Sequence, residues 1–138
     1  MDMTLERFRK AHREFFETAL AEIRSGKKTS HWIWFIFPQI QGLGRSSVAM
    51  YYEIQSRKEA MDYWADPVLS DHMIRICQAL LKLEDPIEEI MGFPDNLKLR
   101  SSMTLFLLVT GEPIFRQVLD QFYGGSLDDY TQKKLNEI

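Results

Sequence analysis

Signals that begin and end helices recur along this chain, and they constrain its fold more than any other feature. Asp66–Pro67 places a capping residue before a proline at the first helical position, and Asp85–Pro86 repeats that arrangement. Pro113 opens a segment in which apolar residues recur every three or four positions, and Gly124 ends it. No Asn-Gly or Asp-Gly hairpin turn is present. We therefore expect an all-α fold of about eight short helices, in a single domain covering residues 1–138.

Three further helices are expected from the same signals. The first should follow the apolar positions from Leu5 to Ile23 and stop at Gly26. Ser56 is followed by a glutamate at capping-box spacing, so a helix should start near Arg57. A last short helix should run from residue 128 to about residue 136.

The segment His31–Pro38 contains two tryptophans and two phenylalanines. A lone strand here would leave its backbone groups without partners. We therefore expect a short buried helix over Trp32–Phe37 with Ser30 as its cap. It should end before Pro38, because a residue that precedes proline avoids the helical region. Most of these aromatic side chains should belong to the core.

The composition is that of an ordinary globular domain, and it argues against several kinds of site. The chain has 138 residues, 45% of them hydrophobic, and a net charge of −3, so no general attraction to nucleic acid is expected. Its one cysteine, Cys77, permits no intrachain disulfide, and no Cys/His zinc spacing occurs, so we expect no metal site and a cytoplasmic location. No apolar run approaches the roughly 18 residues of a membrane span, and the N-terminus lacks a signal-peptide pattern.

Two windows of the sequence, residues 24–52 and 96–111, contain no acidic residue, and each includes Arg-Ser-Ser. In the first copy, Gly42 and Gly44 free the backbone before Arg45. Its first serine, Ser46, is a good N-cap, so this copy should start a helix whose free N–H groups, together with the arginine, suit an anion.

The second copy should lie inside a helix that begins near Asp95. Lys98 and Ser102 then share one face, as do Arg100 and the threonine four positions later. Serine is a poor choice for a helix interior, so either a small side chain or a hydroxyl is needed at Ser101 and Ser102.

His31 is the candidate catalytic residue. It stands beside two tryptophans and close to lysines, whose positive charge would keep the imidazole neutral near pH 7 and suited to proton transfer or hydrogen bonding. The alternative is a half-buried histidine bonded to the backbone. His12 and His72 should lie at the edges of the apolar faces of their helices.

Three stretches of the chain resemble a bacterial family known as domain of unknown function 1810. They are SHWIWFIFPQIQGLGRSS at 30–47, ADPVL at 65–69 and FPDNLKLRSSMTLF at 93–106. The resemblance covers about residues 5–122 and implies an all-α fold, but it brings no reaction with it. The label calpastatin, sometimes attached to this family, does not fit, because calpastatins are disordered inhibitors and this composition is that of a compact domain.

Two functions fit these residues. The first is a small-molecule site for an anionic ligand, nucleotide-like or otherwise phosphorylated, and the sequence leaves open whether it is enzymatic and whether it uses a cofactor. The second is a protein–protein interaction module without catalysis, since Trp, Tyr and Arg are favoured interface anchors. The oligomeric state is likewise left open. With His31 as the catalytic candidate, the candidate ligand-binding residues are Trp32, Trp34, Gln39, Gly42, Gly44, Arg45, Ser46, Lys98, Arg100, Ser101 and Ser102.

We also expect the two Arg-Ser-Ser segments to meet around one anion-sized hollow. Arg45 and Arg100 each lie in a window without acids, and two nearby cations repel each other by roughly 3 kcal/mol at 6 Å and an effective dielectric constant of 20. A bound anion would offset that repulsion.

Overall fold

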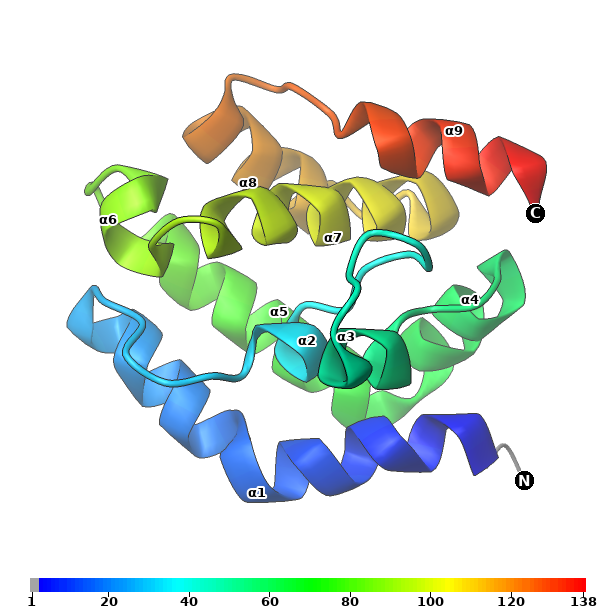
Figure 1. Cartoon of the computed structure of the whole chain (residues 1–138). Helices are drawn as coiled ribbons and strands as arrows, with labels where there is room; N and C mark the ends of the chain where they lie inside the picture. Colours follow the sequence, from blue (N-terminus) through cyan, green and yellow to red (C-terminus); the bar gives the residue numbers. More distant parts are fainter. Residues whose placement is uncertain (1–2) are drawn as a thin grey trace.

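The computed structural model describes residues 3–138, and within that range nine α-helices form (Figure 1). Residues 1 and 2, which the single-domain prediction includes, lie outside the described residues. Between residues 3 and 138 there is no β-strand, so the prediction of an all-α fold is confirmed. The helices are α1 (Met3–Ser25), α2 (Ile33–Ile36), α3 (Ser47–Tyr52), α4 (Arg57–Ala65), α5 (Pro67–Leu81), α6 (Ile87–Met91), α7 (Asp95–Thr110), α8 (Pro113–Tyr123) and α9 (Asp129–Glu137).

Most helix ends lie where the capping signals placed them. The Ser56 hydroxyl accepts a hydrogen bond from the Glu59 backbone N–H, and Asp66 caps the first turn of α5 through its side chain. Gly124 adopts a left-handed conformation, with φ of +61°, directly after α8. These bonds close within one turn, which is why the sequence was sufficient to predict them.

Two capping predictions are wrong. Asp85 does not cap α6, whose N-cap is Pro86, with no side-chain hydrogen bond. Ser30 does not cap α2 either: the N-cap is Trp32, again without a side-chain bond. The Ser30 hydroxyl instead donates to the carboxylate of Glu22 on α1. A long-range partner has replaced the local one.

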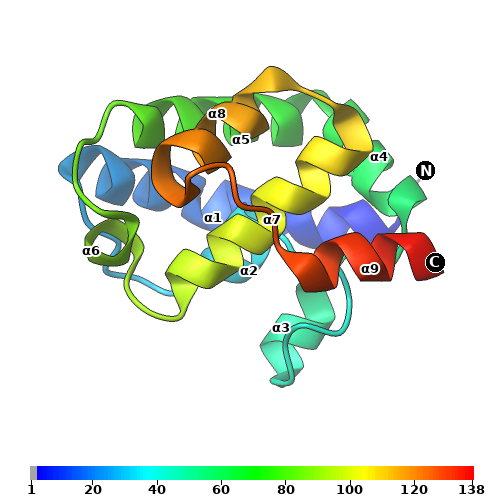
Figure 2. The same ribbon diagram turned by 90° about the horizontal axis from the view of Figure 1, so that it is seen from above.

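The helices surround one core. α1 lies along one side of the molecule and α7 and α8 along the other, with α5 crossing between them and packing on both α1 and α8; α9 covers α7 from outside (Figures 1 and 2). Trp32, Phe35 and Phe37 are buried, which confirms that most of the aromatic run belongs to the core. Among the described residues, no helix has the length and apolarity needed to cross a bilayer.

The Gly-Leu-Gly-Arg-Ser-Ser segment lies on an excursion from this core, residues 41–53, that is closed at its base. Ile40 and Ile54 form an isolated parallel β-bridge and are both fully buried. The excursion carries α3, which has no buried residue and projects from the body of the molecule in Figure 2. Ser46 caps α3 as predicted, accepting from the Ala49 N–H at 3.1 Å.

A buried histidine joins three helices and corrects another prediction. His12 is only 3% exposed rather than at the edge of its helix. Its Nε2 lies 2.8 Å from the Phe35 carbonyl oxygen of α2, and its Nδ1 lies 2.9 Å from Nδ1 of the half-buried His72 on α5. A carbonyl can only accept, so His12 carries its proton on Nε2 and accepts from His72 at Nδ1. Both rings are neutral in this arrangement.

This network makes stability depend on pH. Burial lowers the pKa of His12 to about 4, and burial also lowers the pKa of His72. Unfolded histidine titrates near 6.5, so between the two values the unfolded chain binds more protons, and stability falls as pH falls. We expect the free energy of unfolding to drop by about 2 kcal/mol between pH 7.5 and pH 5 because of His12.

Urea unfolding at the two pH values measures this drop. His12→Gln, which keeps a donor but does not titrate, should lose most of the pH dependence, whereas His31→Gln should keep it. Equal pH dependence in His12→Gln and the unchanged protein would contradict the assignment.

Candidate functional site

The loop before α2 is organised by one carboxylate. Glu22 accepts hydrogen bonds from the backbone N–H groups of Thr29 and Ser30 at 2.7 and 2.9 Å, from the Ser30 hydroxyl, and from the Trp32 indole N–H at 2.9 Å. Partial burial alone would raise the pKa of Glu22, but these donors outweigh it and hold the pKa at about 2. The carboxylate therefore stays ionised and bonded at neutral pH.

The hydrogen bonds to Glu22 orient successive side chains of residues 30–32 in opposite directions. Ser30 and Trp32 point to Glu22, and Trp32 is fully buried. His31, between them, is exposed, and within residues 3–138 it has no hydrogen bond or ion pair to protein groups. The structure thus places His31 at the surface, where it lines a hollow, rather than half-buried and bonded to the backbone.

The start of α7 forms the facing wall. Lys28, only 6% exposed, binds Asp95 Oδ2 at 2.7 Å through its Nζ, and the same ammonium donates to the Ser30 carbonyl at 2.6 Å. Its backbone N–H donates to the Ile90 carbonyl at 2.7 Å. These bonds tie the loop before α2 to the turn between α6 and α7.

Between the two walls lies a hollow of about 330 Å³, which we name the His31 pocket. This volume lies at the lower end of the range usual for small-molecule sites. The lining contains two lysines and one aspartate, so its formal charge is +1. The lining residues are Lys28, Thr29, Ser30, His31, Ile33, Trp34, Met91, Phe93, Pro94, Asp95 and Lys98.

Two rings and one lysine are available to a ligand in this pocket. Trp34 is partly exposed, unlike its aromatic neighbours, and Phe93 is 80% exposed. Lys98 Nζ lies 5.6 Å from the Trp34 ring centroid and 3.6 Å from Asp95 Oδ1, and its side chain is 29% exposed. Two predicted residues of one segment, His31 and Trp34, therefore meet a third, Lys98, from the distant helix α7. Sequence reasoning missed Lys28 and Phe93 as site residues, although Phe93 belongs to a stretch that carries the family resemblance.

Comparison with known proteins supports that resemblance. Residues 2–135 match the model of a family described as "Protein of unknown function (DUF1810)". The chain belongs to the DUF1810 family. It is similar to the solved structure of a conserved hypothetical protein, Rv1873, from Mycobacterium tuberculosis, with a TM-score of 0.93 and 39% identity over 96% of each chain. No curated protein matches the chain. Neither description states an activity, so a function for this DUF1810 protein has to be argued from its site.

The other predicted residues of the stretch 30–47 do not line the His31 pocket. Trp32 is buried in the core and Gln39 precedes the excursion, whereas Gly42, Gly44, Arg45 and Ser46 lie on the excursion. Gly42 has φ of +97°, and a Cβ there would meet the Tyr130 hydroxyl; at Gly44 a Cβ would lie 2.3 Å from Ala49 Cβ. Both glycines thus have packing reasons. Gln39 and Gly44 line a second hollow beside Trp34 with room for about one water. Arg45 is exposed.

The second Arg-Ser-Ser copy lies within α7, as predicted. Arg100 faces Asp128 at 3.9 Å, and its Nε is buried without a hydrogen-bond partner. The Ser101 hydroxyl donates back to the Leu97 carbonyl at 3.2 Å, and Ser102 is fully buried, with no partner for its hydroxyl. Both serines are buried within α7 and do not line the His31 pocket.

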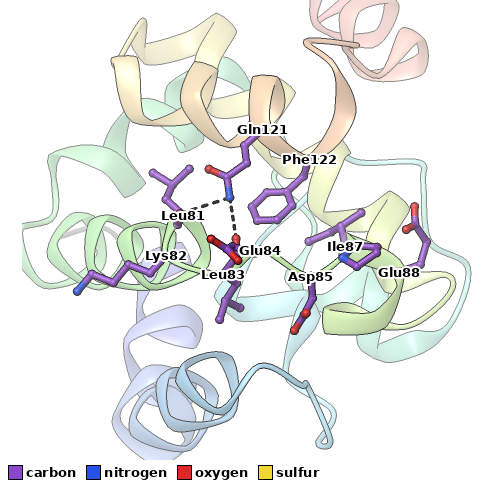
Figure 3. A pocket seen from close by; sticks show the side chains of 10 residues that line it. Leu81, Lys82, Leu83, Glu84, Asp85, Ile87, Glu88, Gln121 and Phe122 are labelled. Atoms are coloured by element: carbon purple, nitrogen blue, oxygen red, sulfur yellow. Dashed lines mark hydrogen bonds between the residues drawn. The ribbon is translucent and has the colours of Figure 1, made fainter.

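Two other hollows differ from the His31 pocket in the charge of their linings. The larger, about 630 Å³, lies between the α5–α6 loop and α8, where Gln121 donates to the Leu81 and Leu83 carbonyls and Phe122 points inward (Figure 3). Its rim carries Glu84, Asp85 and Glu88, which disfavour an anion. No residue predicted as a site residue lines it.

The smaller of these two hollows, about 260 Å³, lies between α1 and α5 and is basic, with Arg24, Arg75 and Lys82 in its lining. Arg24 and Lys82 stand at the C-terminal ends of α1 and α5, where cations offset the helix dipole. Arg75 faces Glu17 and Asp71 at 3.9 and 3.8 Å. Local roles therefore account for these three cations.

The contact between Gly44 and Ala49 gives a test of the excursion. Gly44→Ala should push α3 away and reduce the free energy of unfolding by about 1–3 kcal/mol, the usual cost of overpacking. The double variant Gly44→Ala/Ala49→Gly removes the clash, so a double-mutant cycle of unfolding free energies should show a favourable coupling of at least about 0.5 kcal/mol. Strictly additive effects would show that the two positions do not touch.

Proposed function

We propose that the His31 pocket binds a small anionic molecule, either nucleotide-like or another phosphorylated metabolite. The observation that carries the proposal is that His31 and Trp34, from one segment, converge with Lys98 of the distant helix α7 on one concave hollow. A concave pocket lined by rings with a few polar groups is the usual form of a small-molecule site.

Charge within the pocket favours an anion. Lys28 is committed to Asp95 and to the Ser30 carbonyl, so the carboxylate already has a close cation. Lys98 lies farther from Asp95, at 3.6 Å, and stays partly exposed. Its ammonium group is the surplus charge, and a phosphate or carboxylate can accept its free N–H groups.

His31 supports a further role at the same site. An exposed imidazole at the pocket edge can donate a hydrogen bond to a bound anion or transfer a proton to it. We keep His31 as the catalytic candidate within this proposal.

The alternative function, a protein–protein interaction module, is favoured by a different surface. Val48, Met50 and Tyr51 on the projecting α3 are all exposed apolar side chains. They lie outside the His31 pocket, so the two functions can be tested separately.

Lys98→Ala tests the anion site. Losing one charged hydrogen bond should raise the Kd of AMP by about ten- to hundredfold, from about 1.5–3 kcal/mol of lost binding free energy, measured by isothermal titration calorimetry. Lys82→Ala is the matched control, since it removes an exposed lysine from the basic hollow between α1 and α5. A loss of affinity in Lys82→Ala but not in Lys98→Ala would move the anion to that hollow.

The shared site of Arg45 and Arg100 remains a separate prediction. For an anion held between the two guanidinium groups, outside the His31 pocket, Arg45→Ala and Arg100→Ala should each weaken binding by about 1.5–3 kcal/mol. Unchanged affinity in both variants would assign Arg45 to the solvent and Arg100 to its pairing with Asp128.

A further inference from the structure

We propose that the His31 pocket selects ligands that carry a flat heteroaromatic ring, and that Phe93 is the residue that sets this specificity. The chemical class is then a nucleoside phosphate rather than a sugar phosphate. This inference rests on the function proposed above and chooses between the two ligand classes left open there.

The exposure of Phe93 is the first observation. At 80%, it is the most exposed large apolar side chain in the described part of the chain. It packs into no helix interface, yet it lines the pocket. An exposed aromatic at the rim of a hollow gains by burial when a ligand covers it.

The turn that carries Phe93 is held on both sides. The Gly92 N–H donates to the Glu88 carbonyl, and the Asn96 N–H donates to the Gly92 carbonyl, both at 2.9 Å. The ion pair between Asp95 and Lys28 fixes the turn to the opposite wall at 2.7 Å. The backbone around Phe93 is therefore placed before any ligand arrives, which reduces the ordering cost of binding.

Trp34 supplies the second ring. It is the one aromatic side chain of the run 32–37 that is not buried, and it lines the same hollow as Phe93. Lys98, the surplus cation, lies 5.6 Å from the Trp34 ring centroid. A ligand ring stacked on these side chains would therefore hold an attached phosphate close to the ammonium group. A sugar phosphate would satisfy Lys98 but leave both rings without a stacking partner.

Neither the acidic hollow beside α8 nor the basic hollow between α1 and α5 has this combination. The acidic hollow has a single ring, Phe122, beside three carboxylates, and the basic hollow has no aromatic residue in its lining. Two rings and a surplus cation occur together in the His31 pocket.

The test is a calorimetric titration of the full chain with AMP, ribose 5-phosphate and inorganic phosphate. We expect AMP to bind at least about tenfold more tightly than ribose 5-phosphate, the usual effect of one stacked base. Phe93→Ala should weaken the binding of AMP about tenfold and leave the affinity for ribose 5-phosphate unchanged. Phe93→Tyr should retain the preference for AMP. Lys98→Ala should weaken both ligands by a similar factor. Tyr51→Ala, which removes another exposed aromatic on α3, is the control and should change neither affinity.

The outcomes separate the two proposals. If no anion binds, the proposed function fails. If AMP and ribose 5-phosphate bind equally and Lys98→Ala weakens both, the anion site stands and the ring specificity is overturned. Equal loss of affinity for both ligands in Phe93→Ala would also overturn the ring specificity, because Phe93 would then contribute to the shape of the pocket rather than contact the ligand ring. Circular dichroism of each variant checks that the helices are intact.

Discussion

The carboxylate of Glu22 is the interaction on which the candidate site depends. Four donors from residues 29–32 converge on it, and each belongs to the segment that leads into α2. With Ser30 and Trp32 held inward, the residue between them has to face outward. The exposure of His31 therefore follows from the hydrogen bonds that Ser30 and Trp32 donate to Glu22. The bond from Trp32 also holds the indole ring in the core at the start of α2.

The ion pair between Lys28 and Asp95 carries this order across to α7. It joins a loop near the start of the chain to the first turn of a helix that begins much later, at 2.7 Å and largely shielded from water. Asp95 is thereby neutralised, and Lys98 is left as the cation with spare donors. The ion pair between Lys28 and Asp95 thus decides the electrostatic character of the pocket.

The site residues predicted from the sequence include two contrasting groups. Contacts within the fold account for the identity of Gly42, Gly44, Ser46 and Ser101. These are contact with Tyr130, contact with Ala49, capping of α3, and a bond to the preceding turn of α7. His31, Trp34 and Lys98 have no such complete account within the fold, and these three share the pocket. That contrast is the physical reason to look for a ligand there rather than at the Gly-Leu-Gly turn.

The sequence by itself determined the helical class and most helix ends, because Ser56, Asp66, Pro113 and Gly124 act on backbone groups within one turn. It also indicated His31, Trp34 and Lys98 as candidates. Only the tertiary structure decided that Ser30 binds Glu22 instead of capping α2, that His12 is buried against Phe35 and His72, and that Phe93 faces the same hollow as Trp34. Each of these three features depends on which segments pack together. A hydrogen bond between distant segments produces no periodic pattern in the sequence, so the sequence alone does not predict it.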